Sequence, residues 1–201
     1  EHILDQAIRK EFPAAGELEG KYILLKNVIL ELIEKIFRLD SKEVPFRILA
    51  LEKEVNEVFK INDTQSVLIH GYIDRIDELN GGIRILDYKT GKVAKKKFNE
   101  IADLFHDPVY KEQFQAMLYA FLVRKNYLDS AIRSGLITLK DMSNGIWYLQ
   151  QGEPFSNEQF LEFENQLRLL ISKILDPSVA FTQTDDIDRC KYCDFAEICN
   201  R

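Results

Sequence analysis

Apolar side chains recur at helical spacing between Tyr22 and Leu39, and this pattern predicts an amphipathic helix that Asp40-Ser41-Lys42 closes. The residues of its apolar side are Leu25, Val28, Ile29, Leu32, Ile33 and Ile36. After Pro45 the composition and the alternation become those of β-strands. The predicted strands cover residues 46–59, 67–79 and 83–89. The first half of the chain is therefore expected to form one helix followed by three strands.

The second half predicts a helix, two strands and a last helix. The first helical pattern covers residues 109–127, and its apolar side consists of Phe114, Met117, Leu118, Phe121 and Leu122. A hairpin is expected over residues 135–140 and 146–150, and Ser156-Asn157 predicts the cap of a helix that ends at Leu175, before Pro177. This order of elements predicts the α/β fold class, with a mixed central β-sheet flanked by helices.

The composition fits one domain with a substantial core, since 46% of the 201 residues are hydrophobic. No apolar run is long enough to cross a bilayer, and the start lacks the basic and apolar regions of a signal peptide. A cytoplasmic protein without a membrane partner is therefore expected. Because the chain does not begin with Met, we expect residues 1–201 to be one domain, a C-terminal fragment of a larger protein, with a cysteine-bearing tail over 184–201.

The formal net charge of −6 argues against a general nucleic-acid binder, whose affinity comes from neutralised phosphates. Bound cations can offset an acidic active site, however, and so limit this objection. Basic residues also gather in one short stretch, which contains Lys89, Lys92, Lys95, Lys96 and Lys97. A lysine run of this kind is more often a solvated loop than a binding site.

The hairpin that Asn80-Gly81-Gly82 closes brings three chemically active side chains together. Side chains alternate along a strand, so Asp87 and Lys89 share a face. If Asn80-Gly81 is the two-residue loop, Asp74 lies opposite Asp87. If Gly81-Gly82 is the loop, Asp74 lies opposite Lys89. Either register places the three on one face, and a three-residue loop separates them.

Two carboxylates that face each other across a strand pair lie only about 5 Å apart and repel each other. A divalent cation removes this repulsion, and Mg²⁺ or Mn²⁺ prefers oxygen ligands and keeps several waters. The alternative is an ordinary exposed hairpin with charges of both signs. Asp77 and Arg84 illustrate this alternative, because the first register makes them a surface ion pair without a functional role.

Gly-x-x-Asp-Arg-x-Asp from Gly71, followed by Leu-Asp-Tyr-Lys-Thr-Gly, resembles the core of the PD-(D/E)XK nucleases, specifically the RecB/AddB-like branch. The resemblance implies a restriction-endonuclease-like core, Mg²⁺ or Mn²⁺ as cofactor, and hydrolysis of DNA phosphodiesters. Asp74 and Asp87 match the two acidic metal ligands, and Lys89 matches the catalytic lysine. It also implies that the backbone carbonyl of Tyr88 completes the metal shell.

Residues 113–119 resemble the Gln-x-x-x-Tyr helix of RecB-like enzymes, in which Gln115 and Tyr119 contact substrate or support the site. They share a helix face because they are four residues apart. The family often has a further glutamate on the preceding strand, and Glu52 and Glu54 are the candidates, with Glu54 preferred. The family histidine has no match, since none of His2, His70 and His106 stands in a corresponding context.

Cys190, Cys193 and Cys199 resemble the C-terminal cysteine cluster of AddB-type domains. That resemblance implies a 4Fe–4S cluster in the full-length parent, with the fourth cysteine upstream of this fragment, because such clusters take four thiolates. A zinc site shared with a partner ligand is an alternative.

The favoured function is a metal-dependent deoxyribonuclease domain of a helicase-nuclease or a DNA repair protein. Its expected partners are single-stranded or unwound DNA and a helicase domain or subunit. The alternative from a different class is a silent nuclease fold that binds DNA or supports assembly. Together, Asp74, Asp87 and Lys89 favour the enzyme, because a silent copy does not need all three.

Overall fold

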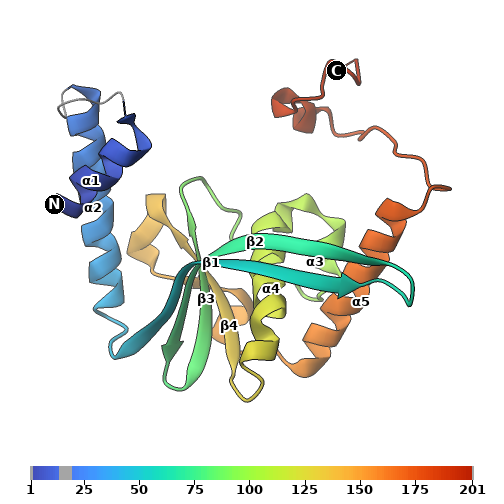
Figure 1. Cartoon of the computed structure of the whole chain (residues 1–201), viewed down its shortest axis with the longest axis horizontal. Coiled ribbons are helices and arrows are strands. Elements are labelled where there is room, and N and C mark those ends of the chain that lie inside the picture. The colour runs from blue at the N-terminus through green and yellow to red at the C-terminus, as the bar shows by residue number, and fades with distance from the viewer. Residues whose placement is uncertain (1, 14–19, 201) are drawn as a thin grey trace.

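A five-stranded mixed sheet, in the order β1-β2-β3-β4-β5, forms the centre of the computed structural model, which describes residues 2–13 and 20–200 (Figure 1). The strands are β1 (Phe46–Lys60), β2 (Ser66–Leu79), β3 (Gly82–Lys89), β4 (Ile132–Thr138) and β5 (Trp147–Tyr148). The α-helices are α1 (His2–Glu11), α2 (Lys21–Asp40), α3 (Asp103–His106), α4 (Lys111–Val123) and α5 (Asn157–Leu175). Only β3 and β4 are paired in parallel, so the predicted mixed sheet flanked by helices is confirmed.

Most predicted elements are present with boundaries close to the expected ones. The predicted cap of the last helix is confirmed, since Ser156 Oγ accepts from the backbone N–H of Gln159 and the Gln159 side chain accepts from that of Ser156. The short elements α1 and α3 were not predicted. Short 3-10 helices fill several connections, namely η2 (Pro108–Tyr110), η3 (Arg124–Asn126), η4 (Leu139–Asn144), η5 (Leu149–Gly152) and η6 (Ile187–Tyr192).

The second predicted hairpin differs from the expectation. Antiparallel pairing of β4 with β5 is present, but β4 begins at Ile132 and β5 has two residues. The strand ends at Tyr148 because Gln150 and Gln151 have φ values of 50° and 60°, which an extended strand does not allow. The connection between the strands is η4 in place of a tight turn.

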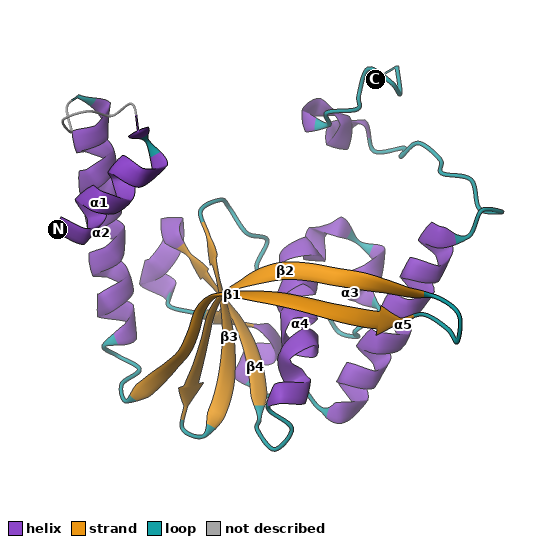
Figure 2. Cartoon of the chain, in the orientation of Figure 1, coloured by secondary structure: helices purple, strands orange, loops and turns teal. Residues whose placement is uncertain are grey.

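Helices cover the sheet on both faces, as Figure 2 shows. One face packs against α4 and α5 and forms the larger core. Its fully buried members include Ile73, Ile85, Met117, Ala120, Leu136 and Phe163. On the other face the C-terminal end of α2 packs against the sheet through a smaller core of Leu39, Leu86, Ile137 and Met142. Within the described ranges, no helix combines the length and the apolar character that crossing a membrane requires.

The β2–β3 turn has the first of the two predicted registers. Leu79 pairs with Gly82, so Asn80-Gly81 is the two-residue loop. Both loop residues have positive φ, 53° and 76°, as type I′ hairpin turns require. This register pairs Asp77 with Arg84 and Arg75 with Leu86.

The prediction that Asp77 and Arg84 form an ordinary surface ion pair is wrong. Asp77 and Arg84 are 0% and 1% exposed, because the end of α2 covers this face. Arg84 donates to Asp77 through Nε (2.6 Å) and Nη2 (3.0 Å), and Arg75 donates to the same carboxylate through Nε (2.7 Å). Asp40, the last residue of α2, pairs with Arg75, and Glu43, just after α2, pairs with Arg84. These two ion pairs complete the buried charge network. The network therefore fastens α2 to the sheet.

Candidate active site

The site lies where β2 and β3 separate. The regular pairing of β2 with β3 stops at Arg75 and Leu86, whereas β3 continues beside β4 as far as Lys89. At the point of separation Asp74 Oδ2 accepts a hydrogen bond of 2.7 Å from the backbone N–H of Tyr88. The side-chain carboxylate of Asp74 thus accepts the hydrogen bond that a backbone carbonyl of the neighbouring strand accepts in a regular strand pair. The sheet opens at this point and brings the two predicted carboxylates to one place.

Asp87 is 4% exposed and lies beside Lys89, whose Nζ is 2.8 Å from Asp87 Oδ2. This contact is an ion pair without hydrogen-bond geometry, so the buried Oδ2 accepts no hydrogen bond from the part of the chain that the structure describes. Burial raises the pKa of Asp87. The Lys89 ammonium opposes this rise, and the Asp74 and Glu112 carboxylates add to it. The site therefore holds a carboxylate whose negative charge the protein alone does not fully satisfy.

Lys89 is held from the other side by the predicted helix pair. Its Nζ donates to Gln115 Oε1 at 2.6 Å, and Gln115 Nε2 donates to the hydroxyl of Tyr119 at 3.1 Å. Both residues come from α4, which packs on β3 and β4. The structure thus joins Tyr119, Gln115, Lys89 and Asp87 in one polar chain, which motif order alone did not show.

Gly71 at the start of the first motif has a steric role. A Cβ atom there would lie 3.1 Å from Tyr119 Cε1 and 3.3 Å from its hydroxyl oxygen. Those contacts are tighter than ordinary van der Waals packing. Glycine therefore lets Tyr119 lie against β2, and the motif residue supports the end of the polar chain.

Two residues of α4 that sequence reasoning missed also belong to the surroundings of the site. The Glu112 carboxylate acts on Asp87 and has a side chain that is only 12% exposed. Gln113 is fully buried and donates to the backbone carbonyls of Ala94 (2.7 Å) and Lys96 (3.1 Å). In the sequence, the sign of their involvement was that they lie close to Gln115 on the same predicted helix. Gln113 fixes the lysine-bearing loop beside the site.

The glutamate suggested on the preceding strand does not join the cluster. Glu54 pairs with Tyr72, two positions before Asp74, and its side chain contacts Asn56 (3.0 Å) and His70 (3.3 Å). Glu52 has a positive φ of 47°, which interrupts the regular alternation of β1. The prediction of Glu54 as a further ligand therefore finds no geometric support, and His70 packs edge-on against Tyr72.

Asp74 and Asp87 fit a magnesium-like ion in their chemistry. Among residues 2–13 and 20–200, no group of three or more His, Cys, Asp or Glu side chains is arranged to hold a metal. Mg²⁺ is usually held by one or two carboxylates, with waters and substrate phosphates supplying the remaining oxygens. Two adjacent carboxylates, one with a buried oxygen that lacks a hydrogen bond, match that requirement.

The three cysteines lie in the C-terminal tail, which extends away from the sheet (Figure 1). All three are free thiols, with Cys193 exposed and Cys190 and Cys199 half-buried. They do not form a three-ligand group within the described part of the tail. The donor set of this chain therefore does not fit a 4Fe–4S cluster by itself, since three thiols are present and four are needed.

Among the comparisons with known proteins, the match to a family model agrees with this geometry. A model of the PD-(D/E)XK nuclease superfamily matches residues 1–200. No curated protein matches the chain significantly. Among solved structures, one described as "Crystal structure of SSO0001" is 17% identical with a TM-score of 0.40, over 96% of this chain and 78% of that chain.

Proposed function

The chain belongs to the PD-(D/E)XK nuclease superfamily, and on this premise we propose that it hydrolyses phosphodiester bonds of DNA with Mg²⁺ or Mn²⁺. The observation that carries the proposal is the convergence of Asp74, Asp87 and Lys89 where β2 and β3 separate. A nuclease fold that only binds DNA does not need a buried carboxylate oxygen that accepts no hydrogen bond from the described part of the protein.

Asp74 and Asp87 are the side chains that would hold the cation, with the backbone carbonyl of Tyr88 as a third ligand. When bound, the ion supplies a water of lowered pKa and stabilises charge on the phosphoryl oxygens. The hydrogen bond from the Tyr88 N–H fixes the Asp74 carboxylate before substrate arrives. Such preorganisation reduces the cost of ordering ligands during the reaction.

Lys89 is the residue positioned to act on the reacting groups. Its ammonium contacts Asp87 and donates to Gln115, so it is fixed at the edge of the carboxylate pair. There it orients the attacking water or stabilises negative charge that develops on the phosphate. Gln115 and Tyr119 act through Lys89 as positioning residues.

The finer assignment is a domain of a RecB/AddB-like helicase-nuclease or a related DNA repair protein, with a helicase as partner. Support comes from the order of the motifs and from the contact of Gln115 with Lys89, which gives the Gln-x-x-x-Tyr helix a role beside the lysine. The iron–sulfur cluster stays a prediction for a longer protein that supplies a fourth thiolate.

A cleavage assay tests the proposal. The chain is incubated with labelled single-stranded and double-stranded DNA, with Mg²⁺, Mn²⁺ or EDTA, next to the Asp87→Asn variant. We expect cleavage that requires the metal and falls at least about a hundredfold in the variant. Asp63→Asn, in the exposed turn between β1 and β2, is the matched control and should cut at the parental rate.

Two results contradict the proposal. Equal cleavage by the parent and Asp87→Asn removes Asp87 from the chemistry and points to a contaminating nuclease. DNA binding without cleavage under every metal condition favours the alternative, a nuclease fold retained as a binding module.

A further inference from the structure

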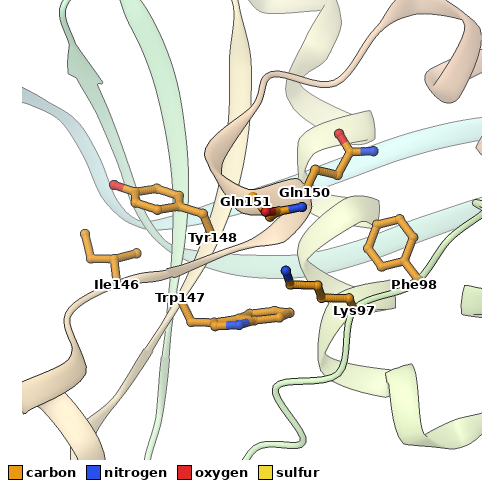
Figure 3. A pocket seen from close by; sticks show the side chains of 7 residues that line it. All are labelled: Lys97, Phe98, Ile146, Trp147, Tyr148, Gln150 and Gln151. Atoms are coloured by element: carbon orange, nitrogen blue, oxygen red, sulfur yellow. The ribbon is translucent and has the colours of Figure 1, made fainter.

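A pocket of about 280 Å³ at the free edge of the sheet contains the single tryptophan of the chain. Its lining residues are Lys97, Phe98, Ile146, Trp147, Tyr148, Gln150 and Gln151. Figure 3 shows Lys97 extending from its loop with its amine toward the centre of the labelled group. This volume suits a single planar group better than a large ligand, because small-molecule pockets begin at about 300 Å³.

The pocket lies on the same face of the sheet as the catalytic carboxylate. Asp87 pairs with Leu136, and Leu136 pairs with Trp147. Directly paired residues share a face, so Trp147 and Asp87 point to the same side, two strand spacings or about 10 Å apart. Leu136 between them is buried in the larger core, so a strand of nucleic acid joins the two places only around the rim of that core, over at least about three stacked nucleotides.

Three polar side chains of the pocket, Lys97, Gln150 and Gln151, have no side-chain partner among the residues that the structure describes. The neighbouring lysines of the loop are paired, Lys95 with Asp141 at 2.9 Å and Lys96 with Asp107 at 3.8 Å. No ion pair within the described chain engages the ammonium of Lys97, and no side-chain hydrogen bond there engages Gln150 or Gln151. The pocket thus combines an aromatic surface with a cation and two amides that are available to a ligand.

The walls of the pocket are built rigidly. Gln150 and Gln151 both adopt the left-handed conformation, which is strained for residues other than glycine and persists only where the surroundings enforce it. Leu149 is 1% exposed and anchors this segment in the core. Arg84 donates to the Tyr148 hydroxyl at 3.0 Å from the buried charge network, so β5 is fixed from the other face.

We propose that this pocket binds one unpaired nucleobase of the DNA strand being cut, stacked on Trp147, with a neighbouring phosphate at Lys97. The inference deepens the proposed function and rests on it for the identity of the strand. Aromatic side chains stack on any base because every base has a π-face, and lysines neutralise the backbone beside it. A base inside a duplex is already stacked and paired and cannot enter, so the pocket selects single-stranded or frayed DNA.

The single tryptophan makes the test direct, since all indole fluorescence comes from Trp147. A twelve-residue oligothymidylate is titrated into the chain carrying Asp87→Asn, in EDTA, with binding followed by fluorescence and by anisotropy of a labelled strand. We expect saturable quenching that follows the anisotropy curve, and no quenching by a blunt duplex of the same length.

Three variants separate stacking and charge from folding. Trp147→Leu should weaken binding by about tenfold or more, and Trp147→Phe, which keeps a ring, should lie between it and the parent. Lys97→Ala should reduce the salt dependence of binding by about 0.7 in the slope of log K against log salt, the value of one phosphate on a single strand. Lys173→Ala, an exposed lysine on α5, should leave that slope unchanged. Thermal unfolding checks that each variant is folded.

The outcomes distinguish the pocket from the nuclease activity. Binding without quenching, with Trp147→Leu binding as tightly as the parent, overturns the pocket while metal-dependent cleavage still stands. Equal quenching by the blunt duplex also overturns it, because a paired base cannot enter. If the quenching is as expected but the parent chain never cleaves DNA, the pocket is supported and the nuclease proposal alone is refuted.

Discussion

Asp87 shows the conflict that the proposed catalytic role imposes on a fold. Its carboxylate is buried beside two other acids, and burial raises its pKa despite the ion pair with Lys89. A buried polar atom without a hydrogen bond costs free energy, so natural proteins keep few of them. Residues held at such a cost are typical of functional sites. The proposed role of Asp87 in catalysis accounts for this cost.

Replacing Asp87 with Asn should raise the melting temperature in EDTA. The folded-state pKa of Asp87 is raised, so folding is favoured when the group is protonated and is opposed by its charge at neutral pH. The neutral amide removes that charge. Calorimetry checks the direction, and Mg²⁺ at ten times its Kd should stabilise the parent by about 1.4 kcal/mol but not the variant. A variant that melts lower than the parent in EDTA contradicts this account of Asp87.

Gln115 should affect catalysis through Lys89. Gln115→Leu removes the acceptor of the Lys89 hydrogen bond, so we expect kcat to fall by about 10- to 100-fold with little change in KM. Gln115→Glu keeps an acceptor and should recover part of the loss, because the Tyr119 hydroxyl can turn to donate. Steady-state kinetics decide, with Gln6→Leu on α1 as control. Equal losses in both Gln115 variants show that Gln115 does not act by accepting from Lys89.

Among the elements, the β2–β3 hairpin decides the site because its turn sets the register. The Asn80-Gly81 loop pairs Leu79 with Gly82. Counted along the two strands from that pair, Asp74 and Asp87 lie at equal distances from the turn. Because the side-chain period of a strand is two, a slip of one residue moves one of these carboxylates to the other face. The position of the site therefore depends on a two-residue loop that touches no catalytic group.

Gly81→Val tests this dependence. Gly81 has a φ of 76°, and an L side chain in this region costs about 1–2 kcal/mol, more for a β-branched residue. We expect the variant to lose at least that stability in urea unfolding, and to lose cleavage if the register shifts. Gly91→Ala is the control, since a Cβ there meets no atom within 4 Å, and it should be nearly neutral. A stable and fully active Gly81→Val variant refutes the role given to the turn.

For the whole molecule, the two faces of the sheet carry separate sets of polar groups. The face under α4 carries the site, and the opposite face carries the buried charge network that joins α2 to the sheet. The network anchors Tyr148 as well, and so supports the edge strand that holds Trp147. The buried charge network and the candidate site are thus supported by the same sheet, but they have no side chain in common.

Arg75→Met should destabilise the protein by about 3–5 kcal/mol, because it leaves the Asp77 and Asp40 carboxylates without their partner. Arg47→Met removes an ion pair that is largely exposed, and should cost about 1 kcal/mol or less. Urea unfolding compares the two. If Arg75→Met folds at low temperature, its kcat should match the parent, since Arg75 lies on the face away from Asp87. A large loss of kcat in that folded variant contradicts the separation of the two faces.

Much of the site was predictable because it is local in the sequence. Asp87 and Lys89 lie on one strand, Asp74 lies across one turn, and Gln115 and Tyr119 are one helical turn apart. Their grouping needs only the periods of strand and helix and one turn type. Glu112 and Gln113 were missed because a polar residue near the start of a helix is usually solvated, and only packing shows otherwise.

The sequence by itself determined most of the long elements, the tight hairpin and the common face of the two acids and the lysine, because these follow from local backbone preferences and side-chain alternation. Only the tertiary structure decided that Gln115 contacts Lys89, that Asp77 and Arg84 are buried, and that Glu54 stays outside the cluster. Those features depend on which elements pack together and which side chains lose contact with water. Burial is a property of the assembled sheet and helices, and no short stretch of sequence contains it.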